Sequence, residues 1–136
     1  MSLLQVTSTS EWMRTQLLAL KTRPETAAYV VGVMADKQLG ELVGAGSVVL
    51  AYSRAGLDFD AHRRLGDGVL ASEIAFRGWL TEPELCVEFA RRSYVTCYRL
   101  LGCTWELYGE LADRLPDIIQ ASRDALSCRT RTPGEP

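Results

Sequence analysis

The sequence has only one histidine, His62, and no run of lysine or arginine residues. A catalytic metal generally needs at least three protein ligands, so a single histidine argues against a histidine-based metal centre. Phosphate binding needs a concentrated basic surface, whereas the formal net charge is -2 and the pI is about 5.4. The composition therefore argues against nucleic acid as the main partner.

Long apolar runs and the motifs of common catalytic sites are also missing. No stretch approaches the ~18 to 20 unbroken apolar residues that cross a bilayer, so no membrane association is expected. The start, MSLLQVTSTSEW, has no basic segment followed by an apolar one, which predicts no secretory signal and a cytoplasmic location. GxSxG, GxGxxG and P-loop motifs are absent. The sequence thus predicts no catalytic residue, metal or cofactor, and favours a protein that is not an enzyme.

None of the four cysteines belongs to a CxxC pair, which argues against a zinc site of the usual spacing. Cys86 and Cys97 lie on one predicted helix, separated by roughly 16 Å along its axis, too far for a disulfide. We expect free thiols that pack as small apolar groups. If one thiol is reactive, the candidates are Cys103 and Cys128, because both lie near predicted helix ends.

The composition that remains is that of an ordinary globular protein, with 136 residues, 47% hydrophobic and 24% charged. A chain of this length can bury a core without disulfides or a structural metal, and it predicts one domain. Six or seven helical segments with short connections predict an all-α, single-domain helical bundle over residues 1–127. The polar, proline-containing tail over 128–136 is expected to be disordered.

Caps, prolines and glycines divide the first half of the chain. Ser8, with a glutamate three residues later, has the spacing of a capping box and predicts a helix over about 9–21. Pro24 suits the first position of a second helix. Residues 41–56 are compatible with a short helix, which we favour, or with a strand. In the second case a short hairpin at about 28–52 would make the fold α+β.

The second half has clearer helix signals. The polar stretch DFDAHRRLGD, with Asp58 as N-cap, opens a helix that runs to about residue 79. The motif TEPE, with Thr81 as cap, predicts a helix over 82–101 that ends at a glycine. A further helix is expected to begin near Thr104, and Pro116 either kinks this helix or starts a new one that ends near residue 126.

Each polar residue of DFDAHRRLGD is expected to serve the helix. Asp60 can reach Arg63 or Arg64, and Arg63 can reach Asp67, at ion-pairing spacings along a helix. The alternative uses Asp58 and His62 as two metal ligands, with others from elsewhere. Asp67 lies between two glycines, and a carboxylate at such a near-buried site must be hydrogen-bonded, by a tyrosine, an arginine or a helix N-terminus. The inward apolar stripe of this helix is predicted to be Leu57, Ala61 and Leu65.

The predicted helix over 82–101 carries a stripe of small side chains, namely Cys86, Ala90, Ser93 and Cys97. This stripe would let another helix approach closely, either from the same chain or from a second copy. An aromatic cluster lies across the following glycine turn and either packs in the core or forms a protein interface. Its members are Tyr94, Tyr98, Trp105 and Tyr108.

The segments FDAHRRLGDGVLASEIAF and YVTCYRLLGCTWELYGELADRLPDI resemble a pattern found in uncharacterised bacterial helical proteins. In that pattern an LGD inside one helix precedes a helix of the form Y…G…Y…LA. The matching residues, all in the second half of the chain, are Leu65, Gly66, Asp67, Tyr98, Gly102, Tyr108, Leu111 and Ala112. This chain has Val69, Leu70 and Ala71 where the pattern has aromatic residues. The resemblance implies a helical fold and bacterial origin, and no function.

A well-formed core without a catalytic motif favours a small protein that binds another protein, as an adaptor, inhibitor or assembly factor, and that forms a homodimer. The alternative is a helical enzyme or ligand-binding protein with a polar pocket around Asp67 and His62, joined by Tyr98 and Arg99. A concave pocket that converges on Asp67 would favour the ligand-binding hypothesis. A flat, exposed apolar patch would favour the protein-binding one.

Overall fold

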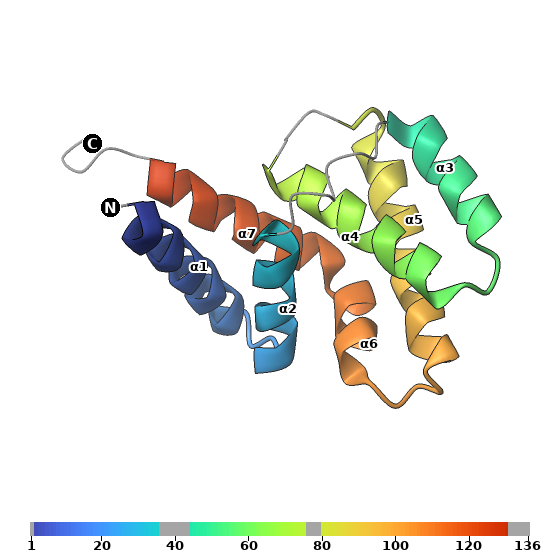
Figure 1. The fold of residues 1–136 in the computed structure, drawn as a ribbon, viewed down its shortest axis with the longest axis horizontal. Coiled ribbons are helices and arrows are strands. Elements are labelled where there is room, and N and C mark those ends of the chain that lie inside the picture. The colour runs from blue at the N-terminus through green and yellow to red at the C-terminus, as the bar shows by residue number, and fades with distance from the viewer. Residues whose placement is uncertain (1, 36–43, 76–79, 131–136) are drawn as a thin grey trace.

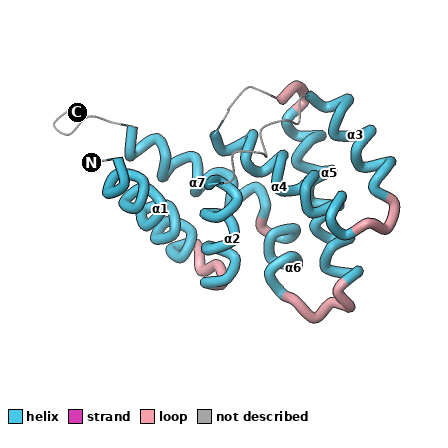
Figure 2. Tube along the Cα trace, in the orientation of Figure 1, coloured by secondary structure: helices cyan, strands magenta, loops and turns pink. Residues whose placement is uncertain are grey.

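The computed structural model describes residues 2–35, 44–75 and 80–130, and all their side chains except those of 2–10, 44–46 and 128–130. Within these residues the chain forms seven α-helices and no strand (Figures 1 and 2). The predicted all-α bundle is therefore confirmed. The hairpin alternative is wrong, because the described part of that range lies in helices α2 (Pro24–Ala35) and α3 (Gly44–Ala55).

The bundle is built around a central pair of helices. Besides α2 and α3, the chain forms α1 (Ser2–Ala19), α4 (Phe59–Ala75), α5 (Pro83–Leu100), α6 (Glu106–Asp113) and α7 (Leu115–Thr130). Helices α4 and α5 pack against each other most extensively, α3 covers both of them, and α6 packs on α5. Figure 1 shows α7 extending from the middle of the molecule to one end, where it packs along α1, while α3 lies at the opposite end.

Several predicted helix boundaries are confirmed. Pro24 begins α2, and Asp58 caps α4 because its Oδ1 accepts a hydrogen bond from the Ala61 amide at 3.3 Å. Gly102, with a φ of 71°, follows the end of α5 in the left-handed conformation that favours glycine. Pro116 is the second residue of α7, so it starts a new helix rather than kinking an old one.

Two predicted caps are wrong. Helix α1 begins at Ser2, so Ser8 lies inside it and cannot be its cap. Helix α5 begins at Pro83, which makes Glu82 the N-cap residue in place of Thr81. Glu82 adopts a left-handed conformation with φ 50°, and its side chain makes no capping hydrogen bond.

The predicted tail over 128–136 and the predicted end of the helix near residue 79 are only partly covered by the described residues. Helix α7 extends through Thr130, so residues 128–130 are helical rather than part of a disordered tail, and 131–136 lie outside the described residues. Helix α4 is described to Ala75, and the predicted continuation over 76–79 also lies outside them. None of the described helices is long and apolar enough to cross a membrane.

One hydrophobic cluster contains described side chains from all seven helices. Its fully buried members include Leu17, Val30, Val48, Leu111 and Ile118. Burial of such side chains stabilises a fold by roughly 1.5–3 kcal/mol each. Of the stripe predicted to face inward on α4, Leu65 is buried but Leu57 is 82% exposed. Leu57 precedes the first residue of α4, so the helical spacing does not apply to it.

The small-residue stripe of α5 packs inside the chain. Cys86, Ala90, Ser93 and Cys97 are all buried, which confirms the first of the two interpretations. Helix α4 also has a small residue at the contact: a Cβ atom added to Gly66 would lie 2.7 Å from ring atoms of Tyr94 on α5. Glycine is therefore required at this position for the two helices to pack as they do.

Candidate functional site

Asp67 is 2% exposed and lies at the centre of a polar cluster between three helices. The hydroxyl of Tyr29, from α2, lies 2.7 and 2.8 Å from the two carboxylate oxygens. The hydroxyl of Tyr94, from α5, donates to Oδ1 at 2.8 Å. Arg63, one turn earlier on α4, lies 3.4 Å from Oδ2. The prediction that Asp67 bonds a tyrosine hydroxyl and an arginine is confirmed.

Both tyrosines in this cluster act as hydrogen-bond donors. Burial, and next the negative charge of Asp67, raise the pKa values of Tyr29 and Tyr94 above the ordinary range. Their hydroxyls therefore stay protonated and their protons are directed at the carboxylate. The arrangement holds α2, α4 and α5 together.

His62 is also buried, at 2% exposure, and both of its ring nitrogens have partners. Nε2 lies 2.9 Å from the carbonyl oxygen of Gly56, and Nδ1 lies 3.1 Å from the hydroxyl of Ser93. A carbonyl only accepts, so we assign the proton to Nε2, with Nδ1 accepting from Ser93. His62 therefore joins the turn before α4 to α5 rather than lying among the polar residues on the surface of α4.

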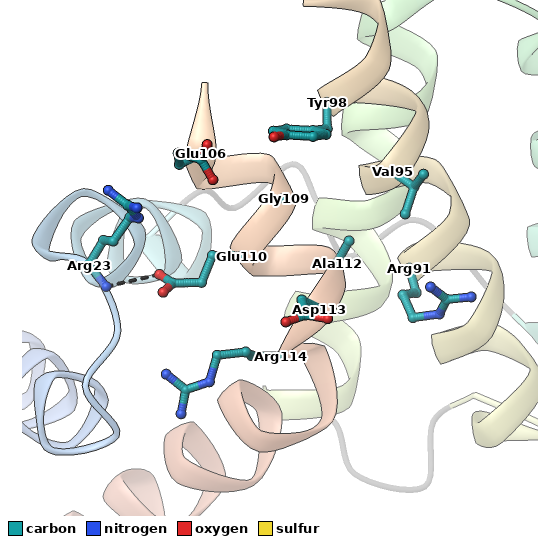
Figure 3. Close-up of a pocket in the computed structure, with 10 residues that line it drawn as sticks. All are labelled: Arg23, Arg91, Val95, Tyr98, Glu106, Gly109, Glu110, Ala112, Asp113 and Arg114. Carbon is teal, nitrogen blue, oxygen red and sulfur yellow. Dashed lines mark hydrogen bonds between the residues drawn. The ribbon is translucent and has the colours of Figure 1, made fainter. Parts of the chain in front are cut away.

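The predicted pocket residues Tyr98 and Arg99 lie apart from Asp67 and His62. Tyr98 lines a cavity of about 460 Å³ between α5 and α6, and Arg99 is exposed. In Figure 3 the Tyr98 ring lies beside Gly109, where an added Cβ would come within 3.1 Å of it. Neither Asp67 nor His62 lines this cavity, so the four residues do not converge on it.

The α5–α6 cavity is polar and its charges are mixed. The backbone amide of Arg23 donates to Glu110 at 2.9 Å, which joins the start of α2 to α6 (Figure 3). The charged lining residues are three arginines and three acidic residues, namely Arg23, Arg91, Arg114, Glu106, Glu110 and Asp113. With this balance the cavity favours neither an anion nor a cation.

A second cavity, of about 670 Å³, forms an open groove between α5 and α7, with Glu73 of α4 also lining it. We call it the α5–α7 groove. Its apolar lining comes from both helices and consists of Pro83, Val87, Pro116 and Ile119. Its polar lining consists of Glu73, Glu84, Glu88, Arg91, Gln120 and Arg123. A groove of this size with apolar and polar sides is within the range of known binding sites.

Ion pairs organise the polar side of the α5–α7 groove. Arg123 of α7 donates to the Glu73 carboxylate and to the Glu73 backbone carbonyl, both at 2.6 Å. Arg91 donates to Glu88 at 2.8 Å, and Arg92 reaches the same carboxylate at 3.2 Å. Bonding to Arg91 lowers the pKa of Glu88 to about 2. Glu88 is thus charged at neutral pH and held by two arginines.

The aromatic cluster predicted as core or interface has members in both surroundings: two tyrosines lie in the core, and Trp105 is partly exposed. Tyr94 and Tyr108 are core residues with 0% and 2% exposure, and offer no surface to a partner. Tyr108 makes edge contacts with Phe59 at 5.5 Å and with Trp105 at 5.3 Å. Trp105 is 48% exposed, so its outer face is available.

The described cysteines are free, with Cys86 and Cys97 buried and Cys103 exposed. Burial raises the pKa of the Cys97 thiol to about 12, and it raises that of Cys86 as well. Both thiols therefore stay protonated and act as small apolar groups. The side chain of Cys128 lies outside the described residues.

No group of three or more histidine, cysteine, aspartate or glutamate side chains is arranged to hold a metal ion in the described part of the chain. The pair Asp58 and His62, considered as metal ligands from the sequence, is occupied otherwise: Asp58 caps α4 and His62 bonds Ser93 and Gly56.

Sequence reasoning missed the long-range members of these sites. Tyr29 is 38 residues from Asp67, Ser93 is 31 residues from His62, and Arg123 is 50 residues from Glu73. The one available signal was the lone polar residue inside an apolar run, as Tyr29 is within α2. Such a residue needs a partner when it is buried, but its identity depends on packing.

Comparisons with protein-family models, with curated proteins and with solved structures give no match to this chain. The resemblance to bacterial helical proteins therefore stays a prediction, and the function is argued from the geometry alone.

Proposed function

We propose that this protein is a non-enzymatic protein-binding module, and that the α5–α7 groove receives a segment of its partner. The observation that supports this is the groove itself, which is lined by apolar residues of two helices and by charged residues. Grooves of this construction are used to bind amphipathic helices of partner proteins. The role of adaptor, inhibitor or assembly factor depends on the partner.

A groove variant in the full-length protein tests this proposal. Val87→Asp places a charge at a partly buried position of the lining and should abolish capture of the specific partner. Arg99→Glu is the control, because this exposed residue lies on the same helix roughly 18 Å along its axis from Val87. Circular dichroism must show both variants folded. A partner set unchanged by Val87→Asp would contradict the proposal.

Self-association is supported by a second surface. Leu57 is 82% exposed, Trp105 48% and Leu100 39%. Phe59, two residues after Leu57, and Trp105 both pack against the ring of Tyr108. Large exposed apolar residues that gather at one end are typical of an interface between copies.

Light scattering tests the homodimer. The wild-type chain should have twice the mass of the monomer, and Trp105→Glu should return it to the monomer. A monomeric wild type at high concentration would contradict it.

Three free thiols among the described residues suit a reducing compartment, which supports our proposal of a cytoplasmic location.

The alternative of a ligand site around Asp67 and His62 has less support. Asp67 is engaged by two tyrosines and an arginine, and His62 by two partners, within the core. A ligand would have to displace these bonds to reach either side chain.

A further inference from the structure

The charges of the α5–α7 groove bear on the chemistry of the partner, and this inference rests on the proposed function. Three carboxylates and two guanidiniums line the groove. Arg123 is paired with Glu73 at 2.6 Å, and Arg91 with Glu88 at 2.8 Å. Among the described residues Glu84 has no ion pair, so it is the unmatched charge of the lining.

Glu73 contributes a second carboxylate to the same lining. Arg123 engages Oε2 and the backbone carbonyl of Glu73, and no described residue donates to Oε1. Glu73 lines the groove. Burial raises the pKa of the Cys86 thiol, and the negative charges of Glu73 and Glu82 raise it further. The groove lining therefore contains two carboxylate groups with acceptor oxygens that no described residue engages, on Glu84 and at Oε1 of Glu73.

The two helix starts at the groove disfavour an anion. The free amides of a helix N-terminus usually attract anions. Here Pro83 begins α5 and Pro116 is the second residue of α7, and both prolines line the groove. Proline has no N–H, so these positions present apolar rings. Glu84 in the first turn of α5 adds a charge that repels anions.

The shape of the site favours a helix over an extended peptide. No strand occurs in the described residues, so they offer no sheet edge to which a partner could add a strand. The groove is bounded by two helices with Val87 and Ile119 between them. Side chains at i and i+4 of a third helix fit between such ridges.

We infer that the α5–α7 groove binds an amphipathic helix of a partner protein that carries a lysine or arginine beside its apolar face. The apolar side chains contact Val87 and Ile119, and the cation reaches Glu84 or Oε1 of Glu73. A solvated ion pair adds modest affinity, but it selects strongly against acidic partners.

A peptide-display selection tests the inference with a defined probe. A library of helical peptides with randomised surface positions is selected on the full-length wild-type protein, and binders that also bind Val87→Asp are removed. The remaining peptides depend on the groove. We expect them to share apolar residues at i and i+4 and to be enriched in lysine or arginine next to these.

The outcomes separate the inference from the proposed function. Groove-dependent peptides that are neutral or acidic would overturn the basic-helix inference and leave the binding function in place. A selection that yields no groove-dependent peptide would overturn both.

Affinity measurements on a selected basic peptide give the second readout. Glu84→Gln should weaken binding about twofold to fivefold, and added salt should weaken the wild type more than the variant. The matched control is Glu82→Gln, two residues away and outside the groove lining, with an effect of less than about twofold. Equal affinities of wild type and Glu84→Gln would overturn the assignment of Glu84.

Discussion

The cluster around Asp67 and the ion pairs around Glu88 use the same chemistry in opposite surroundings. Each is a carboxylate on a helix with an arginine within one turn. The side chain of Asp67 is 3% exposed and that of Glu88 is 38% exposed. A buried carboxylate must be satisfied by the protein, so Asp67 recruits tyrosines from two other helices and joins them. At the surface, Glu88 is bonded by Arg91 and Arg92 of its own helix.

The largest effect is expected from Asp67→Ala. Removing this acceptor leaves the buried Tyr94 hydroxyl without its partner and takes one partner each from the Tyr29 hydroxyl and from Arg63, and it should lower the free energy of unfolding by about 3–5 kcal/mol. Urea denaturation measures it. The matched control is Asp60→Ala, which removes an exposed partner of the same arginine and should cost less than about 1 kcal/mol. Similar costs for the two variants would break the comparison.

A smaller loss is expected from Tyr94→Phe, which removes one hydroxyl from the buried carboxylate without changing the ring. Hydrogen bonds to charged groups contribute about 1.5–3 kcal/mol, and we expect a loss in that range. Tyr52→Phe is the control, because the Tyr52 ring packs on His62 and Phe89 while its hydroxyl has no hydrogen bond among the described residues. Its cost should be below about 0.5 kcal/mol. Equal costs would show that the hydroxyl of Tyr94 contributes nothing specific.

Gly66→Ala tests the packing that brings Tyr94 to Asp67. The new methyl group would lie 2.7 Å from the buried ring, and relieving this overlap should cost about 1–3 kcal/mol, partly offset by the better helix propensity of alanine. Gly32→Ala in α2 has nothing within 4 Å of the added Cβ and should stabilise by up to about 1 kcal/mol. Thermal unfolding of both variants measures these changes in stability. A stabilised Gly66→Ala would show that the contact between α4 and α5 can accommodate a methyl group.

The smallest effect concerns the pH dependence of Glu88. Its pKa is about 2 in the folded protein, below the ordinary ~4.3 of an unfolded chain. Its contribution to stability is therefore complete above pH ~4.3 and lost as the pH falls through about 2. Because the pair is solvated, the amplitude should be under about 1 kcal/mol. NMR titration should find the low midpoint, and replacing Arg91 and Arg92 by alanine should raise it. A wild-type midpoint near 4 would show that the arginines do not hold this carboxylate.

Local signals in the sequence predicted the elements better than the sites. Pro24, Asp58 and Gly102 mark helix boundaries because proline, a capping carboxylate and a left-handed glycine each act through their immediate neighbours. Ser8 misled because a capping-box spacing inside a helix looks the same as one at its start. Within Asp67's own helix, its pairing with Arg63 was predictable from the four-residue spacing.

The composition and local pattern alone determined that this chain is an all-helical protein, and that the carboxylate between two glycines needs hydrogen-bonding partners. Only the tertiary structure decided that Tyr29 and Tyr94 are those partners, that His62 lies in the core, and that Pro83 and Pro116 border one groove. The reason is physical: helix formation depends on residues within one turn, whereas burial and the meeting of distant side chains depend on how whole helices pack.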